Sequence, residues 1–190
     1  FFFFFDCSSM VYYSLQGAGF DLNKTASQFT TSTLFNGSQV TEYAKTHFDV
    51  LPPSSKTDQS LKPGDLIMLR MPSGSQHVAI FKDYDDQGRI QFFGSQTSTG
   101  PATVTLNGNT YWDERSTYYG ALRPKENFIK PEHKIQPEAD NHVSQTSMPS
   151  QQTDAGLTLK DLSERHQILI AQAHEHVHRL YQIHGMPIDQ

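Results

Sequence analysis

Residues 65–95, DLIMLRMPSGSQHVAIFKDYDDQGRIQFFGS, decide the fold. Three apolar runs, at 65–71, 77–83 and 89–95, alternate with clusters of Gly, Ser, Asp and Pro. Short apolar runs bounded by turn-forming residues are typical of strands. We therefore predict three strands, entered through a Lys-Pro-Gly-Asp turn at 62–65. Two further runs, TVTL and TYYGALR, continue this pattern to residue 123.

The residues before this region have helical periodicity. After Cys7, apolar side chains recur three to four residues apart, and Gly17 and Gly19 supply stop signals. A second short helix with a serine start is expected at 38–48, ahead of an extended stretch forced by Pro52 and Pro53. Helices followed by a meander of strands predict an α+β fold.

The composition divides the 190 residues into a packed part and a poorly packed part. Residues 1–124 hold 20 of the 22 aromatic residues, and we expect one domain there. Residues 125–156, rich in Pro, Gln, Ser and Thr, are predicted to be a flexible linker. Residues 157–190 have the pattern of an amphipathic helix, whose apolar stripe needs a docking surface because one helix cannot bury it alone.

Charge and hydropathy exclude several function classes. The chain has 15 basic and 20 acidic residues, so it lacks the basic excess that holds nucleic acid phosphates. No apolar run approaches the roughly 20 residues that cross a bilayer. The opening Phe1–Phe5 is too short and uncharged for a signal peptide, and we expect a truncated N-terminus.

The one cysteine has two interpretations. Cys7 precedes a predicted helix, where free backbone N–H groups and the macrodipole stabilise a thiolate and could also bind a developing oxyanion. His77 begins a predicted strand after a polar loop, so its imidazole could face the edge of a cleft as a base. Alternatively, Cys7 is a small buried apolar residue and His77 an ordinary strand-edge histidine.

Three motifs resemble the NlpC-type cell-wall cysteine peptidases, a papain-like family. They are Asp6-Cys7-Ser8-Ser9 before MVYY, Lys62-Pro63-Gly64-Asp65-Leu66, and His77-Val78-Ala79-Ile80-Phe81. Residues 119–123, YGALR, are similar to the closing strand of the family. The resemblance covers about residues 6–124 and implies a papain-like domain with N-terminal helices on an antiparallel sheet.

The resemblance also implies roles for individual residues. Cys7 would be the nucleophile and His77 the general base, with no metal or cofactor required. Asp6 and Ser8 match positions that contact the substrate peptide, although both residue types are also ordinary helix caps.

A third residue, on the next strand, would orient the imidazole. The family usually has a histidine there, which this chain lacks. Strand alternation places Gln91, Phe93 and Ser95 on one face, and we predict that the Gln91 amide accepts the second ring N–H of His77. Ser95 and a backbone carbonyl are the alternatives.

The implied reaction is amide hydrolysis through a thioester. Cys7 would attack the carbonyl, and His77 would protonate the leaving amine and then activate water. The usual substrate of the family is the peptidoglycan stem peptide, commonly cut between D-glutamate and diaminopimelate. A non-catalytic module that binds wall peptides is the alternative from a different class.

A histidine-rich motif in the tail offers a second chemistry. His174-Glu175-His176-Val177-His178 satisfies the H-E-x-x-H zinc pattern, and His184 falls at the position of a third ligand. A zinc peptidase is the less favoured alternative, because the helix is solitary and Tyr181 replaces the usual glycine of the following turn.

The tail also weakly resembles the C-terminal recruitment regions of effectors exported by type IV secretion systems. This resemblance implies a secreted antibacterial toxin that acts in the periplasm or at the cell wall. Its partners would be an immunity protein or a component of the secretion apparatus. A phage enzyme or a housekeeping wall enzyme suits the same sequence.

Overall fold

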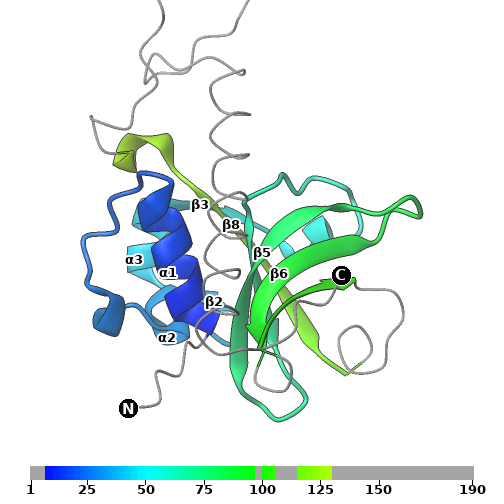
Figure 1. The fold of residues 1–190 in the computed structure, drawn as a ribbon. Helices are drawn as coiled ribbons and strands as arrows, with labels where there is room; N and C mark the ends of the chain where they lie inside the picture. Colours follow the sequence, from blue (N-terminus) through cyan, green and yellow to red (C-terminus); the bar gives the residue numbers. More distant parts are fainter. Residues whose placement is uncertain (1–6, 97–99, 106–114, 130–190) are drawn as a thin grey trace, which may run out of the picture.

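The computed structural model describes residues 7–96, 100–105 and 115–129 (Figure 1). Helices come first, and a six-stranded antiparallel sheet follows in the order β3-β8-β4-β5-β6-β7. The predicted α+β fold is confirmed. The helical elements are α1 (Cys7–Gly17), η1 (Ala26–Gln28), α2 (Thr31–Leu34), α3 (Glu42–His47), η2 (Pro53–Lys56) and η4 (Glu126–Phe128).

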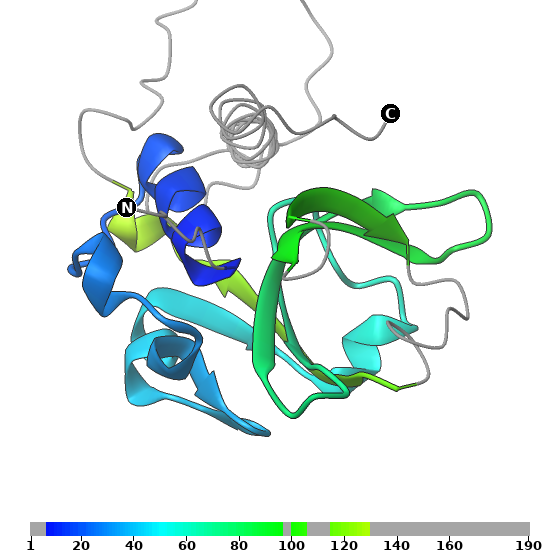
Figure 2. The same ribbon diagram turned by 60° about the horizontal axis from the view of Figure 1, so that its bottom comes forward.

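The strands of the main sheet include all five predicted runs. They are β3 (Phe48–Leu51), β4 (Leu66–Arg70), β5 (Gln76–Tyr84), β6 (Ile90–Gln96), β7 (Gly100–Thr105) and β8 (Thr117–Pro124). Figure 2 shows the three N-terminal α-helices gathered on one side of the sheet. Helix α1 packs against β5 and β6.

Alternation along the strands divides the apolar side chains between two core clusters. The first core cluster joins α1 to the sheet and includes Met10, Val11, Leu15, Leu66, Met68, Val78, Ile80, Phe93 and Leu122. The second core cluster lies on the other face and includes Ile67, Leu69, Ala79, Phe81, Ile90, Phe92 and Ala121. Neighbouring residues of β4 and β5 thus enter different clusters, as the period of two requires.

The Lys-Pro-Gly-Asp turn is confirmed and is pinned by an ion pair. The Asp65 carboxylate is fully buried, accepts the Lys62 N–H at 2.7 Å, and receives Arg123 through Nε at 2.9 Å and a terminal nitrogen at 2.7 Å. Gly64 turns the chain at φ 95°, a conformation that suits glycine. The turn into β4 is therefore anchored to β8.

The region before this turn differs from the prediction. The helix expected at 38–48 begins only at Glu42, because Thr41 caps it by accepting the Ala44 N–H at 3.1 Å. The serine falls instead in the turn of a small hairpin, formed by β1 (Phe35–Asn36) and β2 (Gln39–Val40). Strand β3 was also missed, and it pairs with β8 at the edge of the sheet.

The packed domain extends past the predicted boundary at residue 124. Ile129 is 3% exposed in the first core cluster and forms a bridge with Phe20, while the Lys125 N–H donates to the His47 carbonyl at 2.9 Å. The first five residues of the expected linker are therefore part of the fold. The rest of the linker and the tail helix lie outside the described residues.

Within residues 7–96, 100–105 and 115–129, no helix combines the length and the apolar character needed to cross a membrane.

Candidate active site

Cys7 is the first residue of α1, a helix that the sequence predicted to begin just after it. Its side chain is half-buried and packs against the first core cluster. The unpaired N–H groups of the first helical turn point toward the N-terminal end of α1, where Cys7 lies. The helix macrodipole favours a negative charge at this end. The position suits both a thiolate and an oxyanion.

Ser8 and Asp6, the two residues beside Cys7, were both predicted to contact the substrate. Ser8 is only 2% exposed, so its side chain has little surface to offer a peptide. This burial argues against the predicted contact between Ser8 and the substrate. Asp6 lies outside the described residues.

His77 is the second residue of β5 and lies opposite Leu69 of β4. It is 6% exposed, and this burial lowers the pKa of the imidazole to about 4. Removing a cation from water costs free energy, so the buried ring stays neutral at pH 7. A neutral imidazole is the form that accepts a proton from a thiol.

The Cys7 thiol and the His77 imidazole lie toward opposite faces of the sheet. Val78 points into the first core cluster, against which Cys7 packs, whereas Ala79 points into the second. Alternation therefore starts the His77 side chain on the side of Ala79. The β5–β6 ladder begins only at the Ile80–Phe93 pair, so His77 lies on the part of β5 that precedes this ladder.

The strand register does not bring Gln91 beside His77. Gln91 lies opposite Asp83, beyond a register shift between Phe81 and Asp83. Asp83 is six residues from His77 along β5, which corresponds to about 20 Å at about 3.3 Å per residue. The backbone of Ser95, paired with Pro101, lies four positions closer to the start of β5.

Sequence reasoning missed Gln76, the residue before His77. Its amide Nε2 donates to the Phe35 carbonyl at 2.9 Å, and its Oε1 accepts the Gly37 N–H at 2.8 Å. These bonds tie the start of β5 to the β1–β2 hairpin. The sequence feature that could have identified Gln76 is a polar residue at the start of a buried strand. Strand alternation places its side chain on the face opposite to that of His77.

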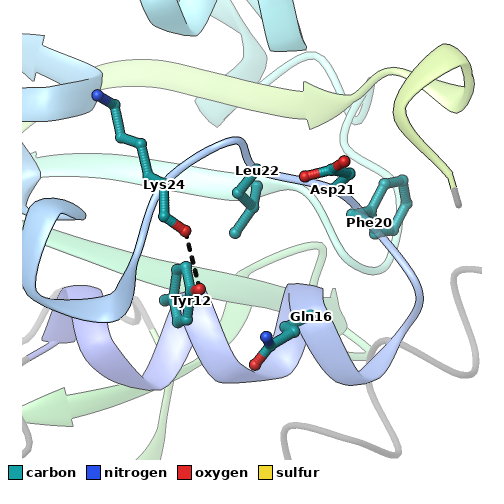
Figure 3. A pocket seen from close by; sticks show the side chains of 6 residues that line it. All are labelled: Tyr12, Gln16, Phe20, Asp21, Leu22 and Lys24. Atoms are coloured by element: carbon teal, nitrogen blue, oxygen red, sulfur yellow. Dashed lines mark hydrogen bonds between the residues drawn. The ribbon is translucent and has the colours of Figure 1, made fainter.

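A small cavity lies farther along α1 and the loop after it. Its volume is about 190 Å³, and Figure 3 shows the Tyr12 hydroxyl donating to the Lys24 carbonyl, at 2.9 Å, on its wall. None of the predicted catalytic residues lines it. The lining residues are Tyr12, Gln16, Phe20, Asp21, Leu22 and Lys24.

Comparison with known proteins places the chain in one family. The model of the NlpC/P60 family matches residues 3–121, which span the described helices except η4 and nearly all of the sheet. No curated protein and no solved structure gives a significant match. The match includes Cys7 and His77 and covers more than half of the chain. The chain therefore belongs to the NlpC/P60 family, whose members are cysteine peptidases and related hydrolases of bacterial cell-wall peptides.

Proposed function

We propose that this protein hydrolyses peptidoglycan stem peptides, with Cys7 as nucleophile and His77 as general base. The observation that carries the proposal is the position of the one cysteine of the chain. Cys7 is the first residue of α1, inside the family match, and that helix packs on the strand that holds His77. A half-buried thiol at a helix start is placed for nucleophilic attack.

The proposed reaction has two stages. In the first, the Cys7 sulfur forms a bond to the amide carbon while its proton passes to His77. The N–H groups of the first turn of α1 stabilise the oxyanion. The C–N bond then breaks, and His77 returns the proton to the leaving amine, which leaves a thioester.

In the second stage, His77 takes a proton from water, and the resulting hydroxide attacks the thioester carbon. The C–S bond breaks, the proton returns to sulfur, and the acid product leaves. Burial keeps the imidazole unprotonated at the start of each stage, and a pKa of about 4 also makes it a weaker base than an exposed histidine.

We propose the bond between D-glutamate and diaminopimelate as the one cleaved, on the resemblance of the three motifs to NlpC-type enzymes. The resemblance of the tail to effector recruitment regions supports a secreted antibacterial role at the wall or in the periplasm. An immunity protein would then be a partner. The tail lies outside the described residues, so this part rests on sequence.

Thiol labelling tests the proposal against the alternative of a non-catalytic binding module. A catalytic Cys7 reacts with iodoacetamide near neutral pH much faster than free cysteine at the same pH. The matched control is the urea-unfolded chain, in which the helix is lost. If the folded protein reacts more slowly than the unfolded chain, the thiol is inert and the binding module is favoured.

A further inference from the structure

Gln76 is attached to the β1–β2 hairpin by both ends of its side-chain amide. The amide donates to the Phe35 carbonyl at 2.9 Å and accepts the Gly37 N–H at 2.8 Å. Phe35 is fully buried and packs against the ring of Tyr119 at 6.1 Å between centroids. Because Gln76 precedes His77 directly, these bonds set the position of the hairpin turn relative to the proposed base.

The hairpin has little internal support of its own. It contains two residue pairs, Phe35–Val40 and Asn36–Gln39. A hairpin this short is not stable alone in water, so its place is set by the groups that hold it. Thr41 holds its base, where the Thr41 N–H donates to the Leu34 carbonyl at 3.0 Å. Gln76 is the side chain that reaches the backbone of its turn.

The surface of the hairpin suits a peptide ligand. The segment FNGSQV, residues 35–40, contains no charged residue. Asn36, Ser38 and Gln39 are exposed and present amide and hydroxyl groups, which can both donate and accept hydrogen bonds. At Gly37, whose φ is 58°, no atom lies within 4 Å of the position a side chain would take. The turn is therefore open at Gly37 and leaves room for a chain to approach.

We propose that Gln76 is a positioning residue that fixes the hairpin at 35–40 as one side of the site that binds cell-wall peptides. This inference rests on the proposed function, since the hairpin would hold the peptide that Cys7 and His77 cleave. Gln76 acts through the hairpin and takes no part in proton transfer. It should therefore affect how tightly a peptide is held much more than how fast a held peptide reacts.

The test compares three full-length variants. Gln76→Met keeps the length and shape of the side chain and removes both hydrogen bonds. Gln76→Glu keeps the acceptor for the Gly37 N–H and loses the donor to Phe35. Gln87→Met is the matched control, because Gln87 is exposed in the β5–β6 turn. Each is assayed for cleavage of a synthetic L-alanyl-γ-D-glutamyl-diaminopimelyl-D-alanine peptide, and its fold is checked by circular dichroism.

We expect Gln76→Met to raise KM about tenfold and to leave kcat within about twofold. Gln76→Glu should also raise KM, because its carboxylate cannot donate to the Phe35 carbonyl and would face it as a second acceptor. Gln87→Met should match the wild type. An unchanged KM in folded Gln76→Met overturns the inference. So does a fall in kcat at constant KM, because that pattern would place Gln76 in the chemistry.

A binding measurement separates this inference from the proposed function. The same peptide is titrated calorimetrically into Cys7→Ala and into Cys7→Ala with Gln76→Met or Gln76→Glu. About tenfold weaker binding with Gln76→Met supports the inference even if the wild type cleaves nothing, in which case the proposed function alone fails. Equal binding by all three overturns the inference and leaves the proposed function intact. If Gln76→Met is unfolded, the Gln76→Glu comparison decides.

Discussion

His77 lies directly opposite Leu69 in the β4–β5 ladder, with 6% of its surface exposed. Leu69 is fully buried, so the imidazole stands at the margin of an apolar cluster. Burial lowers the pKa of His77 from the ordinary 6.5 to about 4. The group that the proposed mechanism uses as a base thus also makes the stability of the fold depend on pH.

The first prediction concerns this pH dependence. The unfolded chain binds a proton at His77 near pH 6.5, whereas the folded chain does so near pH 4. The neutral imidazole therefore contributes to the free energy of unfolding. This contribution is fully present above pH 6.5 and is lost as the pH falls through 4. The loss in the free energy of unfolding is about 3 kcal/mol. Urea denaturation of wild type and His77→Gln at pH 7 and pH 4 measures it. Equal losses in the two proteins would show that His77 is not responsible.

The second prediction concerns Gln91. Because Gln91 lies opposite Asp83, about 20 Å along β5 from His77, Gln91→Ala should keep kcat within about threefold of the wild type. His77→Gln, the matched loss of the base, should lower kcat by at least about a hundredfold. Peptide cleavage assays measure both. A loss of activity in Gln91→Ala as large as in His77→Gln would restore Gln91 as the orienting residue.

The third prediction compares two ion pairs. Arg123→Met leaves the fully buried Asp65 carboxylate without its cation and should cost about 3 kcal/mol of stability. Arg89→Met is the control, because the Arg89 side chain is 38% exposed beside Asp85 at the β5–β6 turn. Its cost should stay within about 1 kcal/mol. Urea denaturation gives both values, and equal costs would refute the distinction.

The fourth prediction concerns Gly120. A side chain there would collide with the Leu51 carbonyl oxygen, and its φ of 122° is already unfavourable for other residues. Gly120→Ala should therefore cost about 3 kcal/mol or more, because β3 and β8 must separate. Gly74→Ala shares a positive φ of 90° but has its nearest atom at 3.9 Å, so it should cost about 1 to 2 kcal/mol. Thermal unfolding distinguishes them, and a milder effect at Gly120 would contradict the close approach.

The sequence predicts the strands better than the contacts between them. The runs at 65–71, 77–83 and 89–95 are recognisable because apolar residues and turn formers are local signals. The register of β5 on β6 depends on a shift between Phe81 and Asp83, which no local pattern marks. Alternation assigns Gln91 a face but no partner on β5. The Ile80–Phe93 pair already sets Gln91 far from His77, and the shift moves it one residue farther.

The candidate site shows the same division. Cys7 could be placed at a helix start because helical periodicity begins directly after it. The burial of His77 could not be predicted, because it depends on residues such as Leu69 that reach it across the sheet. The hairpin at 35–40 was missed because two residue pairs are too short to leave a pattern.

The most direct test of the central claim is digestion of purified sacculi. Wild-type protein, Cys7→Ala and His77→Gln are incubated with sacculi, and the released termini are identified by mass spectrometry. The wild type should expose new diaminopimelate amino groups, and both folded variants should release none. Cleavage that persists in Cys7→Ala would contradict the account, and its loss on chelation would transfer the activity to His174, Glu175 and His178.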